Sequence, residues 1–223
     1  MKRNRTINIL AFFMMVLVVQ AQELKVPKPY HFYNYNSLGL RMGAVYSTIS
    51  LQPSVSDITP ETSYSAGLVY IFSNKKYVGL QIELLYSQRK WKETFVDGTA
   101  TTDLKFLEIP LMTNINLGNE RLKYIINLGT YVSFKLDKSL KMNIPYENPY
   151  FQSIKDRQER NSDFGLLVGG AIRYISHVGI FQLDARYAYG FQKIYNEEAT
   201  GLKFSNMSGI NLALIYTINF SKK

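Results

Sequence analysis

Eight ionisable side chains are the residues of this sequence whose types and spacing could carry chemistry. Each falls on the polar face of a segment in which apolar and polar residues alternate: Arg41, Glu83, Glu108, Lys123, Lys135, Arg173, Asp184 and Arg186. Glu83 and Glu108 lie on neighbouring segments and on the same face, about one diagonal apart. Two carboxyl groups are the pair that glycoside hydrolysis uses. The same pair could instead belong to a buried network in which Arg41, Arg186 or Lys135 neutralises the carboxylates.

Other catalytic or metal-binding groups are few, because the chain has only two histidines and no cysteine. His31 lies in an N-terminal segment and His177 in a short predicted turn, so neither can complete a Ser-His or His-Asp arrangement at the opposite end of the fold. Two isolated histidines make a poor metal site. Asp97 and Asp103 could contact Ca²⁺, but their spacing matches no known calcium loop. We therefore expect no catalytic residue, no metal and no cofactor.

The segments that position these side chains show the period-two alternation of β-strands. In Phe181 to Phe191 the odd positions are apolar and the even positions are mainly polar. Eleven residues suit a tilted strand that crosses a bilayer, which needs roughly 9–11. Eight such strands are expected at about 38–49, 62–72, 77–91, 102–117, 121–136, 161–174, 181–191 and 206–220. Their connections alternate long and short, with the longest at Asp137 to Arg160. The pattern predicts an all-β fold, an eight-stranded antiparallel up-and-down transmembrane β-barrel.

The alternation alone does not decide which face of the strands lines the interior. A soluble ligand-binding barrel of the periplasm would have the same period with its apolar face inside. Here the polar faces carry the ionisable residues and many Gly and Ser, while Tyr and Phe recur near strand ends, as the aromatic girdles of membrane barrels do. An eight-stranded barrel is just wide enough for its own side chains, so we favour the structural ion network over a catalytic pair. Truncating Glu108 should then cost about 3–5 kcal/mol of stability.

The N-terminus has the features of a secretory signal peptide. A basic start is followed by the apolar run Ile7 to Val19 and by Val19-Gln20-Ala21, which suits signal peptidase. We expect a signal peptide at 1–21, an N-terminal periplasmic segment at 22–37 and an outer-membrane barrel at 38–220. Removal of three basic residues would lower the formal charge from +9 to +6. The remaining bases are scattered and the chain is exported, so nucleic acid is not an expected partner.

Several strings resemble the PorT-like outer-membrane β-barrel family, also called the outer membrane protein beta-barrel domain. They are GLQIELLYSQRKW from Gly79, LKFLEIPLM from Leu104, LGTYVSFKL from Leu128, DFGLLVGGAI from Asp163 and LDARYAYG from Leu183. The resemblance implies a barrel of about eight strands in the outer membrane of a Gram-negative cell. Some members are linked to assembly of a protein secretion system, and the resemblance assigns no catalytic residues to this chain.

Pro110 lies within the family's Glu-Ile-Pro-Leu string, and a proline inside a strand predicts a bulge.

The expected function is therefore a non-enzymatic outer-membrane β-barrel with a structural or protein-interaction role. The expected partners are outer-membrane lipid and other envelope proteins, including those of a secretion system to which the barrel could be an accessory. Two alternatives stay open. One is an outer-membrane enzyme acting on lipid or peptide, which needs an exposed acid or nucleophile at the external rim. The other is the soluble periplasmic ligand-binding barrel.

Overall fold

The computed structural model describes residues 35–52, 56–73, 75–119, 121–147, 151–155, 157, 159–176, 178–195 and 204–220. The expected signal peptide, His31, His177 and all but the end of the expected N-terminal periplasmic segment lie outside these residues. The first strand begins at Tyr35, slightly before the predicted start of the barrel.

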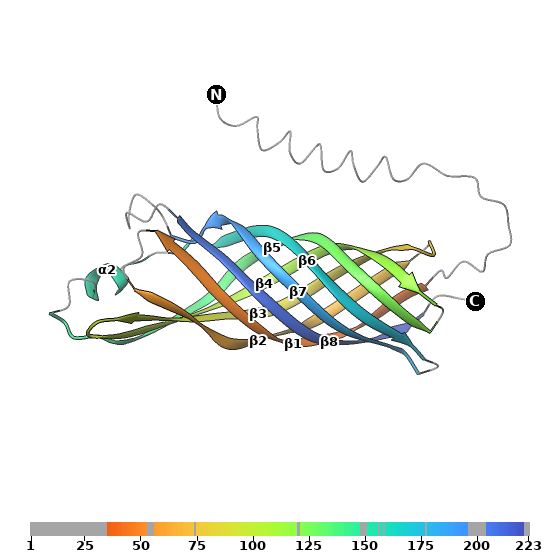
Figure 1. The fold of residues 1–223 in the computed structure, drawn as a ribbon, viewed down its shortest axis with the longest axis horizontal. Helices are drawn as coiled ribbons and strands as arrows, with labels where there is room; N and C mark the ends of the chain where they lie inside the picture. The colour runs from red at the N-terminus through yellow and green to blue at the C-terminus, as the bar shows by residue number, and fades with distance from the viewer. Residues whose placement is uncertain are drawn as a thin grey trace, which may run out of the picture. The chain divides into compact units, whose positions relative to one another are not determined.

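Eight antiparallel strands form one closed ring in which each strand pairs with the next and the last pairs with the first (Figure 1). Their bounds are β1 Tyr35–Gln52, β2 Asp57–Ser73, β3 Val78–Phe95, β4 Gly98–Gly118, β5 Leu122–Asn143, β6 Ser162–Ile175, β7 Ile180–Lys193 and β8 Phe204–Asn219. A short helix, α2, spans Phe151–Lys155 between β5 and β6. The predicted all-β, eight-stranded up-and-down barrel is confirmed.

The two ends of the barrel differ in their connections. At one end, short turns join β2 to β3, β4 to β5 and β6 to β7. The first and last strands meet at this same end, where Ser37 pairs with Asn219 and the Phe220 amide donates to the Asn36 carbonyl at 2.9 Å. In outer-membrane barrels the short turns face the periplasm. We call this the periplasmic end and the opposite one the external end.

The outer wall carries a band of exposed apolar side chains on all eight strands. Leu40, Ile82 and Leu214 are examples, with exposed fractions of 64%, 44% and 64%. Aromatic residues border the band on both sides. The external girdle is Tyr46, Tyr64, Phe134, Phe164 and Tyr189 together with the half-buried Tyr86, and the periplasmic girdle is Phe72, Tyr124, Tyr174, Phe181 and Tyr216. This arrangement suits lipid contact and is opposite to that of a soluble ligand-binding barrel, whose apolar residues would line the interior. Among the described helices, none is long and apolar enough to cross a membrane.

The strands β2 to β5 continue past the external girdle, and Figure 1 shows the β3–β4 hairpin reaching beyond the ends of β6 to β8 on the side of α2. The loop predicted at Lys92 to Thr101 is wrong, because β3 and β4 extend until only Val96 and Asp97 lie between them. The predicted long loop likewise begins later than Asp137, since β5 runs to Asn143. These segments look like loops in the sequence because their outward side chains are polar.

The predicted bulge at Pro110 is also wrong. Pro110 lies opposite Tyr131 of β5 with the register unbroken on either side. Toward β3, Leu111 pairs with Ile82 and Glu108 with Leu85, and the two residues between them on each strand are skipped without a shift. The missing proline N–H therefore interrupts the ladder locally and leaves the register intact. The bulge of the β4–β5 pair lies at Leu136, which has no partner between the pairs Lys105–Asp137 and Phe106–Lys135.

Candidate functional site

A cluster of four charged side chains lies inside the barrel at the level of the lipid-facing band. Arg186 of β7 donates two hydrogen bonds to Glu83 of β3, at 2.8 and 2.7 Å, across the interior. Its Nε lies 2.5 Å from Asp184 Oδ1. Arg41 of β1 completes the cluster, with its Nε 3.5 Å from Glu83 and its Nη2 3.8 Å from Asp184. Two guanidinium groups and two carboxylates thus alternate, and their charges cancel within a site from which solvent is excluded.

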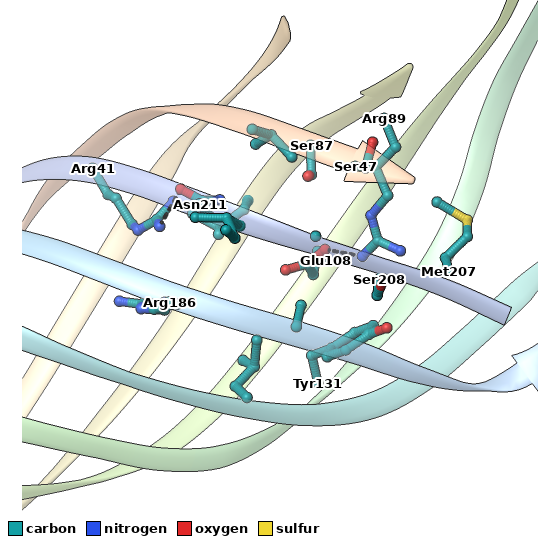
Figure 2. Close-up of a pocket in the computed structure, with 16 residues that line it drawn as sticks. Arg41, Ser47, Ser87, Arg89, Glu108, Tyr131, Arg186, Met207, Ser208 and Asn211 are labelled. Carbon is teal, nitrogen blue, oxygen red and sulfur yellow. Dashed lines mark hydrogen bonds and ion pairs between the residues drawn. The ribbon is translucent and has the colours of Figure 1, made fainter. Parts of the chain in front are cut away.

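A second cluster lies nearer the external end and contains two residues that the sequence analysis did not include. Arg89 of β3 forms an ion pair with Glu108 of β4 at 2.5 Å, and its other Nη lies 3.4 Å from Asp163 of β6. The Tyr131 hydroxyl donates to Asp163 at 2.8 Å. The Arg89 guanidinium also lies over the Tyr131 ring at 5.2 Å from its centre, so the ring shields it from one side. Figure 2 shows Arg89 and Glu108 pointing toward each other from adjacent strands.

The prediction that Arg41, Arg186 or Lys135 neutralises both glutamates is therefore half wrong. Arg41 and Arg186 contact Glu83, whereas Glu108 pairs with Arg89. Both residues could have been placed inside the barrel from the sequence. Arg89 lies an even number of positions from Glu83 and so on the same inward face of its strand, and Asp163 is related to Gly165 in the same way. Glu83 and Glu108 are one diagonal apart, as expected, because Leu85 is the partner of Glu108.

The remaining three predicted residues occupy different surroundings. Arg173 is fully buried toward the periplasmic end and donates to Gln182 at 2.7 Å and to Asn114 at 3.1 Å. Asn114 donates to Asn127, which donates to Asp184, so side-chain amides link Arg173 to the first cluster. Lys123 is buried opposite Arg173 on the neighbouring strand. Lys135 belongs to the external end, where its amine donates to the Glu159 carbonyl at 2.9 Å.

A cavity of about 30 Å³ separates the two charged clusters, and Arg41, Arg89, Glu108 and Arg186 are among the residues that line it (Figure 2). This volume holds one or two water molecules. It is too small for a sugar ring or a peptide between Glu83 and Glu108. In the part of the chain that the structure describes, no group of three His, Cys, Asp or Glu side chains is placed to hold a metal ion.

The external mouth of the barrel is filled by apolar side chains and bridged by the β5–β6 connection. Trp91, Leu104 and Phe106 form the buried cluster of this mouth with Ile49, Leu51, Ile194, Tyr195 and Met207. Arg157, from the connection after α2, donates to both carboxylate oxygens of Glu93 at 2.9 Å and lies over the Tyr195 ring. Burial alone would lower the pKa of Arg157, but Glu93 and Tyr195 outweigh it and the pKa lies above its ordinary value. Burial also raises the pKa of the Tyr195 phenol.

A second ion pair holds the connection over the mouth. The Lys138 amine lies 2.7 Å from Glu159 and donates to the Arg157 carbonyl at 2.9 Å. The backbone of Glu159 forms a bridge with Tyr195, and the Arg160 amide donates to the Ile194 carbonyl at 2.7 Å. The long connection thus joins the segment that follows β7, and the barrel is closed above the charged clusters.

A comparison with known protein families identifies the family of this barrel. Residues 20–196 match the model of the outer membrane protein beta-barrel domain. The chain belongs to this family. An outer-membrane barrel is the fold that the lipid-facing band, the two girdles and the charged interior together require, and the outer membrane is its location.

The chain is similar to several solved outer-membrane barrels at low sequence identity. The outer membrane protein OprG from Pseudomonas aeruginosa is 14% identical with a TM-score of 0.52, and the match covers 85% of this chain and 95% of that one. Ail of Yersinia pestis, solved with the heparin analogue sucrose octasulfate, is 14% identical over 82% of this chain and 99% of its own, with a TM-score of 0.43. Neisserial surface protein A is 13% identical over 80% and 96%, with a TM-score of 0.44. OprG shows the fold alone. No curated protein matches the chain.

Chemically, the two charged clusters inside this outer-membrane barrel are sets of paired opposite charges. Glu83, Glu108, Asp163 and Asp184 each contact a guanidinium group, and each guanidinium of the two clusters contacts two carboxylates. The arrangement can stabilise the barrel and exclude ions from its axis.

Proposed function

We propose that this outer-membrane barrel is not an enzyme and not a channel, and that it serves a structural or protein-interaction role at the cell surface. The observation that carries the proposal is the filled interior, in which a cavity of about 30 Å³ is the space between the two charged clusters. A pore needs a continuous aqueous path, and an enzyme needs a cleft for its substrate. What remains available to a partner is the exterior of the barrel, its connections and its turns.

Conductance measurements test this proposal directly. The refolded barrel, inserted into a planar lipid bilayer, should give no stable conductance steps. An Arg157→Ala, Lys138→Ala variant should loosen the connection over the mouth, and it should still conduct nothing because the two charged clusters close the axis beneath. Lys92→Ala, an outward lysine of β3, is the matched control. Stable, ion-selective steps in the unchanged protein would overturn the proposal.

We further propose that the barrel is an accessory to protein secretion across the outer membrane, with other envelope proteins as its partners. The strings that resemble the PorT-like family support this role, and a closed barrel is suited to holding partners in place. Deletion of the gene should then reduce the export of secreted proteins while the outer membrane stays intact. Normal export in the deletion strain would exclude the role, and accumulation of an unprocessed lipid or peptide would favour the enzymatic alternative.

The membrane location and the signal peptide are tested by fractionation. The protein should appear in the outer-membrane fraction, and its unboiled band should migrate faster on a gel than its boiled band, because the folded barrel resists detergent. The purified mature chain should begin at Gln22 if the expected cleavage after Ala21 occurs. An N-terminal sequence that includes residues 1–21 would exclude the signal peptide.

A further inference from the structure

A shallow groove of about 400 Å³ lies on the outer wall at the external end of β1, β7 and β8. Its lining consists of Ser50, Leu51, Gln52, Tyr189, Phe204 and Asn206. Neither the charged interior nor the closed mouth accounts for it. It is distinct from the wide apolar hollows of the lipid-facing band because half of its lining residues are polar.

The groove begins directly beyond the external girdle. Across the β1–β8 seam, Tyr46 of the girdle pairs with Ile210, and the next outward pairs are Thr48 with Ser208, Ser50 with Asn206 and Gln52 with Phe204. The headgroups of the outer leaflet lie at this level, because aromatic girdles mark the membrane–water interface. A groove here faces sideways into the headgroup layer.

The chemistry of this strip differs from that of the opposite wall at the same level. The outward positions of β3 and β4 beyond the girdle include Lys90, Lys92, Asp103 and Lys105, several of them ion-paired. The strip on β1 and β8 carries hydroxyl and amide side chains with no acid or base. Two aromatic rings, Tyr189 at 42% and Phe204 at 53% exposed, flank these groups.

An irregularity in the sheet opens the groove between the two rings. Tyr189 pairs with Ser208 and Lys193 with Asn206, so three residues of β7 face one residue of β8. The Asn206 side-chain amide donates to the Gly190 carbonyl at 3.0 Å and to the Gln192 carbonyl at 3.4 Å, so it stabilises this bulge and has its oxygen left to accept from a ligand. Phe191, within the bulge, packs edge-on against Phe164 of β6 at 5.8 Å and against Tyr189 at 6.0 Å. Tyr189 and Phe204 both keep a large exposed area beside the bulge, 42% and 53%.

We propose that this groove binds the sugar headgroup of a glycolipid in the outer leaflet of the membrane that holds the barrel. Exposed aromatic faces carry partial negative charge and attract the polarised C–H groups of a sugar ring. Hydroxyl and amide side chains carry both donors and acceptors for sugar hydroxyls. A lysine amine can only donate, and an ionised carboxylate can only accept. The absence of charge among the lining residues favours a neutral sugar over a phosphate. The Lys193 amine lies over the Phe204 ring, 5.8 Å from its centre, so a sugar would have to stack on the opposite face of that ring.

The test uses the full mature barrel in nanodiscs of phosphatidylcholine that contain a phosphate-free glucosyl diacylglycerol at a low mole fraction. Native mass spectrometry counts the lipids that stay bound. The unchanged barrel should retain the glycolipid over phosphatidylcholine, and Phe204→Ala should lower this retention about two- to ten-fold, the range expected for loss of one aromatic contact. Gln52→Ala should lower it less. Phe134→Ala, which removes an equally exposed ring of the girdle on β5, is the matched control and should change nothing.

Three outcomes would overturn the inference: no enrichment of the glycolipid by the unchanged barrel, an equal loss in Phe134→Ala, or stronger retention of phosphatidylglycerol than of the glycolipid. The last result would assign the surface to phosphate. Each variant must first show the faster-migrating unboiled band, and Gln52→Ala keeps the test decisive should Phe204→Ala fail to fold. Equal binding of soluble glucose oligomers to the inserted barrel would contradict a membrane source.

Discussion

Strand β3 passes through two regions that differ in which face of the strand is apolar, and the change occurs at the external girdle. Below Tyr86, its outward side chains are apolar and its inward ones include Gln81 and Glu83. Above Tyr86, Trp91 and Phe95 point inward and Lys90 and Lys92 point outward. The alternation of buried and exposed positions is unbroken along the strand. The solvent on the outside changes from lipid to water, and the distribution of polarity inverts with it.

The inversion shows what holds each region together. Within the lipid band, bulk water reaches neither side of the wall, so the buried charges must pair with one another. Above the band, the sheet packs as in a soluble protein, around an apolar cluster with ion pairs at its edge. The two regions should therefore respond differently to the same kind of change.

The largest effect is expected from breaking the first charged cluster. Arg186→Met leaves Glu83 and Asp184 with Arg41 alone and should lower the free energy of unfolding by about 3–5 kcal/mol. Urea titration in lipid vesicles, followed by the fraction of faster-migrating unboiled band, measures this. Ala188→Gly, on the same strand, is a control for the backbone. A loss below 1 kcal/mol would mean that water reaches this cluster.

Glu108→Ala should have the next largest effect. It removes the first partner of Arg89, but Asp163 remains 3.4 Å away, so we expect about 3 kcal/mol, the lower end of the range for a broken buried pair. The same titration applies. Unchanged stability would show that Asp163 alone neutralises Arg89, and an Asp163→Asn, Glu108→Ala double variant would then reveal the full cost.

The position of the girdle itself can be tested by moving a lysine along the outer face of β3. Leu84→Lys places a charge against acyl chains and should cost about 2–3 kcal/mol, whereas Gln88→Lys, beyond the girdle, should cost about 0–1 kcal/mol. Both variants add the same side chain to the same strand, so each is the control for the other. Equal costs at the two positions would refute the placement of the lipid boundary at Tyr86.

A smaller effect is expected at the closed mouth. Arg157→Met leaves Glu93 without its guanidinium partner, and we expect a loss of about 1–2 kcal/mol because water can enter from the loop side. Trp91 is the chain's one tryptophan and lies 3.4 Å from Glu93, so its emission reports on this region. The emission should shift to the red while the unboiled band stays unchanged. Loss of both signals together would show that the two regions unfold as one.

The smallest effect is expected for the exposed pair Lys105 and Asp137, whose side chains lie 2.8 Å apart. The hydrogen bond from Lys105 lowers the pKa of the Asp137 carboxyl below its ordinary value of 3.8, and Asp137 raises the pKa of the Lys105 amine. The pair should thus stabilise the barrel slightly at neutral pH. The contribution is lost as the pH falls through the carboxyl's folded pKa or rises through that of the amine. Lys105→Gln should remove this dependence, and salt should mask it.

Much of the fold was predictable because period-two alternation reports local side-chain direction. The eight strands, the inward face and seven of the buried charges follow from it. The external parts of β3, β4 and β5 did not, since the outward face there is polar and a polar segment resembles a loop. Arg89 could have been included, since it lies on the same inward face as Glu83, but its contact with Asp163 could not have been predicted. That contact joins β3 to β6 across the interior, and sequence spacing contains no information on which side chains meet across a closed ring. Lys135 fits the inward period but lies beyond the girdle.

The seam between β1 and β8 has a consequence for how the protein is made. Arg41 and Asn211, which share a hydrogen bond, are 170 residues apart, so the ring cannot close until the last strand has left the ribosome and crossed the cell envelope. Any chain truncated before β8 retains two unpaired strand edges and an uncovered cluster of charges, a species prone to aggregation. Ring closure therefore selects for full-length chains, because only a polypeptide that includes β8 can form a stable barrel in the membrane.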